Sequence, residues 1–338
     1  MKSKIIAEIG NLHEGSLGIA LSFIEMLSES GVDIIKFQMH IGEFEGIPEE
    51  TFRVPFSPQD KNRQKYWERT AFTDREWTLI SDYVSELGME FLCTPFSVEA
   101  AKRLLDLTNI KRWKVASGDA VNLPLLDFLL TTNLPLVIST GLISQEEIEI
   151  LKIRLTKRGN WAETTLMHCI SEYPTALHRS SLGQIKELEN LGCKVGLSDH
   201  SGSTTPSLYA ISKNLEFIEV HMTPHKKFFG PDVSSSLTPE EISTIVKYRN
   251  ELQIIEDGEI SKAQIFADSE KTRKLFRKGI YWAGSFLAGH ICTIQDLKFL
   301  KPVAEMDSVD FESILGKRLI SDVSTLQPVN LKQFEGQV

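Results

Sequence analysis

The sequence lacks the features on which membrane proteins, nucleic-acid-binding proteins and secreted proteins depend. No apolar run is long enough to cross a bilayer. The run near the first residue is too short for a signal peptide and is interrupted by Glu8. Acidic residues outnumber basic ones, and the net charge of −9 argues against a nucleic-acid-binding surface. We therefore expect a cytoplasmic protein that acts on small molecules, with neither nucleic acid nor a membrane as partner.

Cysteine is also scarce, with four residues in a chain of 338. None forms the C-x-x-C pair that zinc-finger and thioredoxin-like sites need. Cys93 and Cys169 lie in apolar runs and are expected to be small, reduced core residues. Nothing in the sequence around Cys93 indicates the low pKa that a nucleophilic thiol requires.

The chain instead contains eight short apolar runs that each end in polar residues. They are residues 4–10, 32–38, 89–96, 112–118, 135–141, 165–171, 194–200 and 217–223. Helix-like segments separate them, and three begin with capping boxes, Thr73 with Glu76, Ser144 with Glu147 and Thr238 with Glu241. Strands that alternate with helices predict parallel βαβ units. Eight such units in roughly 250 residues favour a closed (β/α)₈ barrel over an open doubly wound sheet.

The pattern also predicts the domain organisation. Residues 1–255 are expected to form the barrel, 256–278 a charged and irregular linker, and 279–338 a compact β-rich module. That module is too small to bury much surface alone and is expected to dock on something. Residues 41–72 interrupt the alternation, and they either shape a substrate pocket or form a surface insertion.

Lysines near the ends of two predicted strands point to an anion site. Lys36 and Lys114 would be desolvated at the barrel mouth and would need a negative partner. Hydroxyl groups on intervening strands would complete a phosphate or carboxylate cradle, namely those of Thr94, Ser117 and Ser139. Alternatively, each lysine pairs with a carboxylate such as Glu8 or Asp119, or one lysine forms a Schiff base.

Two histidines lie at corresponding ends of the last two predicted strands. His200 and His221 are close enough there to share one divalent metal ion, or each is a hydrogen-bonded core residue. Glu8 is either a general base toward water or the partner of a lysine, and both roles are compatible. Asp232 follows the eighth run, where it could receive a substrate hydroxyl or belong to a surface turn.

These blocks together resemble those of the sialic acid synthases, or more broadly the nonulosonic acid synthases. The blocks, in the order of that family, are AEIGNLHEGS, IIKFQ, FLCTPFS, KVASGDAVNLPLL, VISTGL, HCISEYPT, VGLSDHSG and GPDVSSSLTPEE. The segment that begins at Gly279 resembles the family's antifreeze-like (SAF) C-terminal domain. The resemblance runs almost from end to end of the chain.

The resemblance implies a (β/α)₈ TIM barrel followed by a small antifreeze-like β-rich domain. It implies a homodimer in which each small domain covers the partner's active site. The implied reaction condenses phosphoenolpyruvate with an open-chain N-acetylated hexosamine, such as N-acetylmannosamine, and releases phosphate. A divalent metal, manganese or magnesium, is expected as the cofactor.

The same resemblance assigns residues to roles. Phosphoenolpyruvate would be held by Lys36, Thr94, Lys114, Ser117, Ser139 and Ser198, and the metal by His200 and His221. Glu8 would handle the proton of water, and Asp119, Tyr173 and Asp232 would face the sugar, with Gln38 nearby. Ser171, at the end of the sixth run, joins the substrate-binding candidates.

The chain departs from the family pattern at two places. Val220 and Met222 flank His221, where many relatives have a basic residue and a Phe-Thr pair; Lys226 or Lys227 could replace an arginine that follows. Lys301 with the Pro-Val-Ala that follows stands where relatives have Arg-Pro-Gly, and lysine does not replace a guanidinium. A modified sugar of the legionaminic or pseudaminic type is therefore an alternative acceptor. A Schiff-base aldolase and a non-catalytic carbohydrate-binding protein are further alternatives.

Overall fold

All eight predicted strands are present in the structure, a computed structural model that describes residues 2–336. They are β1 (Lys4–Gly10), β2 (Ile34–Met39), β3 (Glu90–Pro95), β4 (Trp113–Val115), β5 (Leu136–Ser139), β6 (Thr165–Cys169), β7 (Lys194–Asp199) and β8 (Phe217–His221). The strands form one parallel sheet in the order β3-β2-β1-β8-β7-β6-β5-β4. Because β3 and β4, at the two ends of this order, also lie against each other, the sheet forms a nearly closed barrel. The predicted TIM barrel is confirmed.

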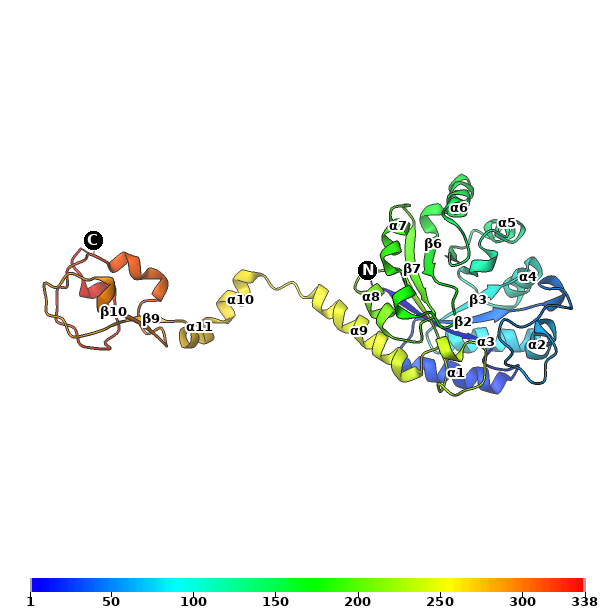
Figure 1. Cartoon of the computed structure of the whole chain (residues 1–338), viewed down its shortest axis with the longest axis horizontal. Helices are drawn as coiled ribbons and strands as arrows, with labels where there is room; N and C mark the ends of the chain where they lie inside the picture. The colour runs from blue at the N-terminus through cyan, green and yellow to red at the C-terminus, as the bar shows by residue number, and fades with distance from the viewer. Residues whose placement is uncertain (1, 337–338) are drawn as a thin grey trace. The chain divides into compact units, whose positions relative to one another are not determined.

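Helices follow the strands around the barrel (Figure 1). They are α1 (Leu17–Ser30), α2 (Arg63–Thr70), α3 (Asp74–Glu86), α4 (Val98–Leu107), α5 (Leu123–Thr131), α6 (Gln145–Lys157), α7 (Ile185–Glu189), α8 (Thr205–Ile211) and α9 (Pro239–Asp257). The capping boxes of α3, α6 and α9 form as predicted, because each N-cap hydroxyl accepts from the backbone of a glutamate whose carboxylate reaches back. Helix α2 was not predicted and lies within the segment 41–72, after the short 3₁₀ helix η1 (Gly42–Phe44).

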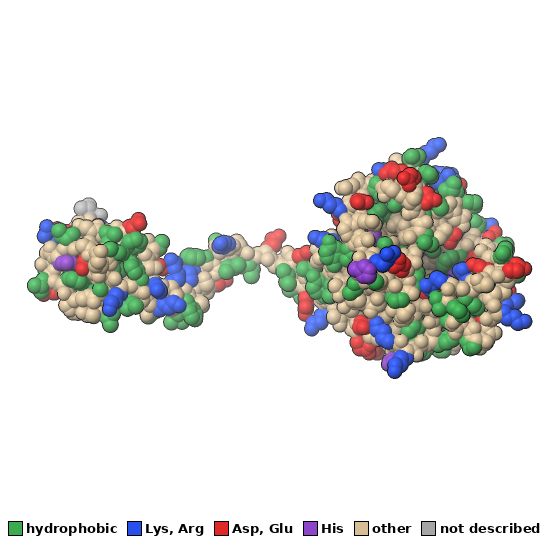
Figure 2. All heavy atoms as spheres, viewed as in Figure 1, with side chains coloured by type: hydrophobic (Ala, Val, Ile, Leu, Met, Phe, Trp, Pro, Cys, Tyr) green, Lys and Arg blue, Asp and Glu red, His purple; other side chains and the backbone are tan. Residues whose placement is uncertain are grey.

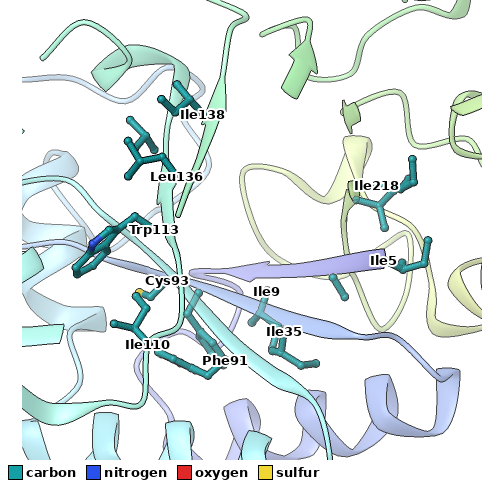
Figure 3. Close-up of a cluster of buried hydrophobic side chains, with 14 of the residues drawn as sticks. Ile5, Ile9, Ile35, Phe91, Cys93, Ile110, Trp113, Leu136, Ile138 and Ile218 are labelled. Carbon is teal, nitrogen blue, oxygen red and sulfur yellow. The ribbon is translucent and has the colours of Figure 1, made fainter. Parts of the chain in front are cut away.

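Because successive side chains of a strand point to opposite faces, the barrel strands contribute to two separate apolar layers. Outward-facing residues such as Ile35, Phe91 and Trp113 pack in the large cluster between the strands and the helices, part of which Figure 3 shows. The inward-facing residues form a separate buried cluster, made of Ile6, Ile34, Leu92, Val137, Met167 and Phe217. This inner cluster fills the barrel, so the barrel is a packed core rather than a pore.

The next inward-facing position on each strand lies two residues further along and is polar on most strands. These positions hold Glu8, Lys36, Thr94, Ser139, Cys169, Ser198 and Glu219, and all seven side chains are buried. Strand β4 adds Lys114. The alternation with a period of two therefore places the ionisable groups directly above the apolar layer, at the C-terminal end of the barrel.

Of the described residues, 257–336 belong to a second compact unit. Its antiparallel strands β9 (Gly279–Trp282) and β10 (Leu297–Leu300) pack on a small core that includes Trp282, Leu319 and Phe334. The segment expected to be an irregular linker contains two helices, α10 (Lys262–Asp268) and α11 (Glu270–Phe276). The hydroxyl of Ser261 caps α10 by accepting from the Gln264 N–H, a helix start that was not predicted.

Apolar side chains are exposed along residues 254–276, from the end of α9 to the end of α11, which we call the connecting region (Figure 2). They include Ile254, Ile255, Ile265, Phe266, Leu275 and Phe276. In residues 2–336, no helix has both the length and the apolar composition that crossing a membrane requires.

Packing in the inner layer predicts a stability effect at Gly196 of β7. A Cβ atom at this position would lie 2.4 Å from Met167 Sδ and 2.7 Å from the Phe217 carbonyl oxygen, so Gly196→Ala must displace a neighbour. We expect the substitution to lower the free energy of unfolding by about 1–3 kcal/mol. Gly183→Ala is the matched control, because no atom lies within 4 Å of its added Cβ. Urea unfolding of both variants measures the difference, and equal stabilities would contradict the described packing.

Candidate active site

A cavity of about 510 Å³ opens at the C-terminal end of the barrel. Its volume suits a small-molecule ligand. Most of the predicted site residues line it: Lys36, Gln38, Thr94, Lys114, Ser117, Ser139, Ser171, Tyr173, Ser198, His200, His221 and Asp232. Glu8 is fully buried and is not part of the lining, but it contacts Lys36 and Gln38, which are.

Two carboxylates and two ammonium groups form a buried cluster at the base of this cavity. Lys36 Nζ lies 3.2 Å from Glu8 Oε2 and 3.0 Å from Glu219 Oε1. Lys114 Nζ lies 3.6 Å from the same Glu219 oxygen and donates to Ser139 Oγ at 2.7 Å. The side chains of the four charged residues are at most 5% exposed, so their charges interact at low dielectric.

The cluster gives its two carboxyl groups opposite protonation behaviour. Burial raises the pKa of Glu8 to about 7, and the negative charge of Glu219 adds to this effect, whereas Lys36 and Gln38 oppose it. Burial alone would also raise the pKa of Glu219, but the ammonium groups of Lys114 and Lys36 outweigh it and lower that pKa to about 2. Glu219 is therefore a permanent carboxylate, and Glu8 can exchange a proton near neutral pH.

The two lysines also differ. Burial lowers the pKa of Lys36, but the carboxylates of Glu219 and Glu8 outweigh it, so the net shift is upward. For Lys114, burial dominates over the attraction of Glu219, and the pKa is lowered. The pairing of Lys36 with Glu8 corresponds to one of the alternatives left open by the sequence, whereas Asp119 pairs with neither lysine.

Two neutral histidines lie beside the cluster. The ring centroids of His200 and His221 are 5.2 Å apart. Burial lowers the pKa of each to about 3, and the positive charge of Lys36 contributes to the shift at His221. Both are therefore in the form that binds metal ions. His200 Nδ1 lies 2.9 Å from the Ile170 carbonyl oxygen, so Nδ1 donates a proton and Nε2 keeps a free lone pair.

This donor set is compatible with a divalent cation that has two protein ligands. In the described part of the chain, no group of three or more His, Cys, Asp or Glu side chains is arranged to hold a metal. Water or substrate oxygens would therefore complete the coordination shell. The Tyr173 ring, whose centroid is 4.2 Å from that of His200, closes one side of the histidine pair.

An arginine from the segment 41–72 reaches the cavity wall. The Arg53 guanidinium lies 4.3 Å from the Tyr173 ring centroid and donates to Asp232 Oδ1 at 2.7 Å. Burial raises the pKa of Asp232, and the Arg53 charge opposes that shift. Phe52, Phe56, Tyr66 and Trp67 from the same segment also line the cavity. Segment 41–72 thus forms part of the pocket, one of the two roles considered from the sequence.

Asp119, like Glu8, is a predicted site residue that is not part of the cavity lining. It ends the 3₁₀ helix η2 (Ser117–Asp119). Its carboxylate accepts from Asn122 Nδ2 at 2.9 Å. The role assigned to Asp119 by resemblance, a contact with the sugar, stays a prediction.

Sequence reasoning missed Glu219, Arg53 and His40. Glu219 lies two residues before His221 in the run FIEVHMT, so the alternation that places His221 in the barrel also places Glu219 there. The sequence contains no comparable pattern for Arg53 or His40, because the positions of these side chains depend on contacts with the irregular segment 41–72.

Comparisons with known proteins give the family to which the chain belongs. The chain is 28% identical over 322 residues to the N,N'-diacetyllegionaminic acid synthase of Campylobacter jejuni, covering 94% of this chain and 95% of that protein. It is 26% identical over 337 residues to the pseudaminic acid synthase of Helicobacter pylori, covering 98% of each. It is 29% identical over 249 residues to the human N-acetylneuraminate-9-phosphate synthase, covering 72% of this chain and 68% of that one.

A solved structure is also similar to that of this chain. The N-acetylneuraminic acid (sialic acid) synthetase of Leptospira borgpetersenii, crystallised with citrate, superposes with a TM-score of 0.68 at 26% identity, covering 81% of this chain and 92% of that one. The sequence profile of the NeuB family matches residues 23–260, which include all barrel strands after β1 and most of the cavity. This chain belongs to the NeuB family, as its resemblance to the sialic acid synthases predicted.

Proposed function

We propose that this protein is a nonulosonic acid synthase, which condenses phosphoenolpyruvate with an open-chain N-acetylated amino sugar and releases phosphate. The observation on which this proposal depends is the buried cluster of Glu8, Lys36, Lys114 and Glu219 at the base of a 510 Å³ cavity. Relatives that align over almost the whole chain are named as synthases of this kind.

The base of the cavity suits phosphoenolpyruvate. Thr94 Oγ1 is buried there without a hydrogen-bond partner, and a buried hydroxyl in that state costs free energy unless a ligand oxygen accepts from it. Lys36 and Lys114 supply the positive charges. Further hydroxyl groups face the same space, namely those of Ser117, Ser139 and Ser198. Together these donors fit phosphate and carboxylate oxygens.

The outer wall suits the amino sugar. Tyr173 offers an aromatic face, while Asp232 and Arg53 offer an acceptor and donors for hydroxyl and amide groups. The two relatives aligned over 94–98% of this chain are named for N,N'-diacetyllegionaminic and pseudaminic acid, whereas the human N-acetylneuraminate-9-phosphate synthase aligns over 72%. We therefore favour an acceptor of the legionaminic or pseudaminic type over N-acetylmannosamine.

The proton transfers of this reaction fit Glu8. Carbon 3 of phosphoenolpyruvate forms a bond to the aldehyde carbon of the sugar, whose oxygen takes up a proton. The electron pair of the double bond between carbons 2 and 3 makes this bond, which leaves carbon 2 with a positive charge. Water adds to carbon 2 and loses a proton. The bond from carbon 2 to the phosphate oxygen then breaks as the new hydroxyl gives up its proton to the phosphate, and the products are the 2-keto acid and phosphate. With its pKa of about 7, Glu8 would be the group that accepts the proton of water. Lys36, Lys114 and the hydroxyls stabilise the phosphate as it leaves.

A divalent cation, Mn²⁺ or Mg²⁺, would be held by His200 and His221. Their neutral rings and the free Nε2 lone pair of His200 fit such an ion. Bound there, the ion would polarise an oxygen of the aldehyde substrate. Tyr173, packed against His200, would keep water away from the same position.

The second unit is proposed to be an antifreeze-like domain that completes the active site of a second copy in a homodimer. Its small core and the exposed apolar side chains of the connecting region support an association that would cover them.

Phosphate release tests the proposal. Purified protein is incubated with phosphoenolpyruvate, Mn²⁺ and either N-acetylmannosamine or N-acetylated hexosamines with a second acetamido group. We expect release with at least one sugar, fastest with a diacetamido sugar, and none without sugar. Folded protein that releases no phosphate with any of them would contradict the proposal.

A Schiff-base aldolase that uses Lys114 is the second candidate, because burial lowers the pKa of this lysine and favours its free amine. Borohydride trapping separates the two enzymes. A covalent adduct on Lys114, with activity that survives a chelator, would support the aldolase. Lys114→Met should abolish turnover in either case, so this variant serves only as the negative control.

The pKa of Glu8 predicts how the rate depends on pH. The carboxylate that accepts a proton is populated above a pKa of about 7. We therefore expect kcat/KM for phosphoenolpyruvate to be constant above this pH and to fall about tenfold per pH unit below it. Glu8→Gln should lower kcat by about 10²–10⁴-fold and remove this limb of the profile. A wild-type profile that falls on the alkaline side instead would show that Glu8 does not act as a base.

The histidine pair predicts a loss of metal binding on substitution. His221→Ala removes one of two ligands, so we expect at least a tenfold weaker affinity for Mn²⁺ and no turnover, with an unchanged circular dichroism spectrum. Titration calorimetry with Mn²⁺ alone measures the affinity without relying on turnover. His178→Gln is the matched control, because His178 is exposed on the 3₁₀ helix Leu177–Arg179. Equal Mn²⁺ affinity of His221→Ala and wild type would exclude His221 as a ligand.

A further inference from the structure

We propose that His40 is a positioning residue, a buried imidazolium that orients the Gln38 amide so that its N–H group faces Glu8. The hydrogen-bond geometry stands independently of the reaction, whereas its effect on turnover rests on the proposed function. His40 is the first residue after β2, and it connects segment 41–72 to the base of the cavity.

The charge of His40 follows from its two hydrogen bonds. Gln38 Nε2 donates to Glu8 Oε1 at 2.6 Å, so the carbonyl oxygen of the same amide points the other way. That oxygen lies 3.0 Å from His40 Nε2 and can only accept, so Nε2 carries a proton. His40 Nδ1 lies 2.7 Å from Glu45 Oε2, and a carboxylate also accepts. With protons on both nitrogens, the ring has a charge of +1.

Glu45 is fixed as an acceptor by the backbone. Its second oxygen, Oε1, accepts from the Ile41 N–H at 2.5 Å. Both carboxylate oxygens therefore receive donors, and neither needs a proton of its own. The side chains of His40 and Glu45 are 8% and 5% exposed, so their ion pair is shielded from water.

Two aromatic rings hold the imidazolium in place. The His40 ring stacks on Trp67, at 4.7 Å between centroids and 8° between planes, and on Phe96, at 4.2 Å and 16°. A cation between two aromatic faces is stabilised by their quadrupoles. Trp67 belongs to α2 and Phe96 follows β3, so the ring is held by elements that are distant in the sequence.

The other titratable groups near His40 are compatible with its charge. Asp119 adds a second negative charge that interacts with His40. His13 is neutral, because burial and the charge of His40 lower its pKa to about 3. Arg63, from α2, lies 4.7 Å from the Trp67 ring centroid and pairs with Glu50, which offsets its charge. Negative groups thus lie closest to His40.

The consequence concerns Glu8. If His40 lost its Nε2 proton, the Gln38 carbonyl oxygen would face the Nε2 lone pair. These two acceptors repel each other, so the observed orientation of the amide would no longer be favoured. The opposite orientation would place an oxygen against Glu8 Oε1, where two acceptors repel unless Glu8 is protonated. His40 therefore favours the carboxylate form of Glu8, the form that the proposed reaction uses.

Nitrogen NMR of the full-length protein tests the charge directly. Histidines labelled with ¹⁵N give distinct patterns for the imidazolium and the two neutral tautomers, and the signal of His40 is identified by its absence in His40→Phe. We expect an imidazolium at pH 7.5. A neutral tautomer at His40 overturns the proposal. This measurement needs no substrate, so it stands even if the wild-type protein releases no phosphate with any sugar.

Kinetics test the consequence. His40→Phe keeps a stacked ring and removes both N–H groups. We expect kcat to fall roughly 10- to 100-fold with KM for phosphoenolpyruvate within about twofold of wild type. The acidic limb of the kcat/KM profile, which reports the pKa of Glu8, should move to higher pH. A purely structural role of His40 would not shift this pKa. Glu45→Gln, which keeps an acceptor but removes the negative charge, should shift the limb in the same direction by less.

His178→Gln is again the control and should leave the profile unchanged. A reduced rate in His40→Phe without a shift of the limb would assign His40 a structural role only. If His40→Phe does not fold, Glu45→Gln and the wild-type NMR measurement decide the outcome.

Discussion

The rest of the site depends on the mutual neutralisation of four charges buried at the base of the cavity. Glu8, Lys36, Lys114 and Glu219 lie directly above the apolar layer that fills the barrel. A buried ion pair adds little net stability, whereas removing one partner leaves an uncompensated charge that costs about 3–5 kcal/mol. A fold that needed only stability would have continued the apolar layer upward. Charged side chains buried at this depth, one of them a carboxyl group with a pKa of about 7, are typical of a reaction site.

The sequence predicts the barrel and the base of the cavity well, for a physical reason. In each parallel strand, every second residue faces the barrel interior. Because the apolar runs are short, the polar residues that end them lie at the same height, at the C-terminal end of the barrel. Lys36, Thr94 and Ser139 follow from this rule. Glu219 follows from it too, because it lies two residues before His221 in the same strand. Its contacts with both lysines make it as central as Glu8.

Residues outside regular strands could not be placed from the sequence. Segment 41–72 has no period that assigns a face to each residue, so the contact of Arg53 with Asp232, 179 positions away, has no local signal. The pairing of His40 with Glu45 is local, but the sandwich between Trp67 and Phe96 is not. Asp119 illustrates the opposite case: it follows a strand, yet η2 turns its side chain toward Asn122.

The contacts of Arg53 also bear on the departure from the family pattern in the second unit. There Lys301 stands where the resemblance calls for an arginine, and its ammonium group lies 5.5 Å from the Phe276 ring centroid of the same unit. Within the barrel, Arg53 already presents a planar guanidinium at the outer wall of the cavity, oriented by the Asp232 carboxylate and the Tyr173 ring. A guanidinium provides paired donors for a carbonyl oxygen, which a lysine ammonium group does not match in geometry. We therefore propose that Arg53, rather than Lys301, supplies the paired donors to an amide of the proposed acceptor.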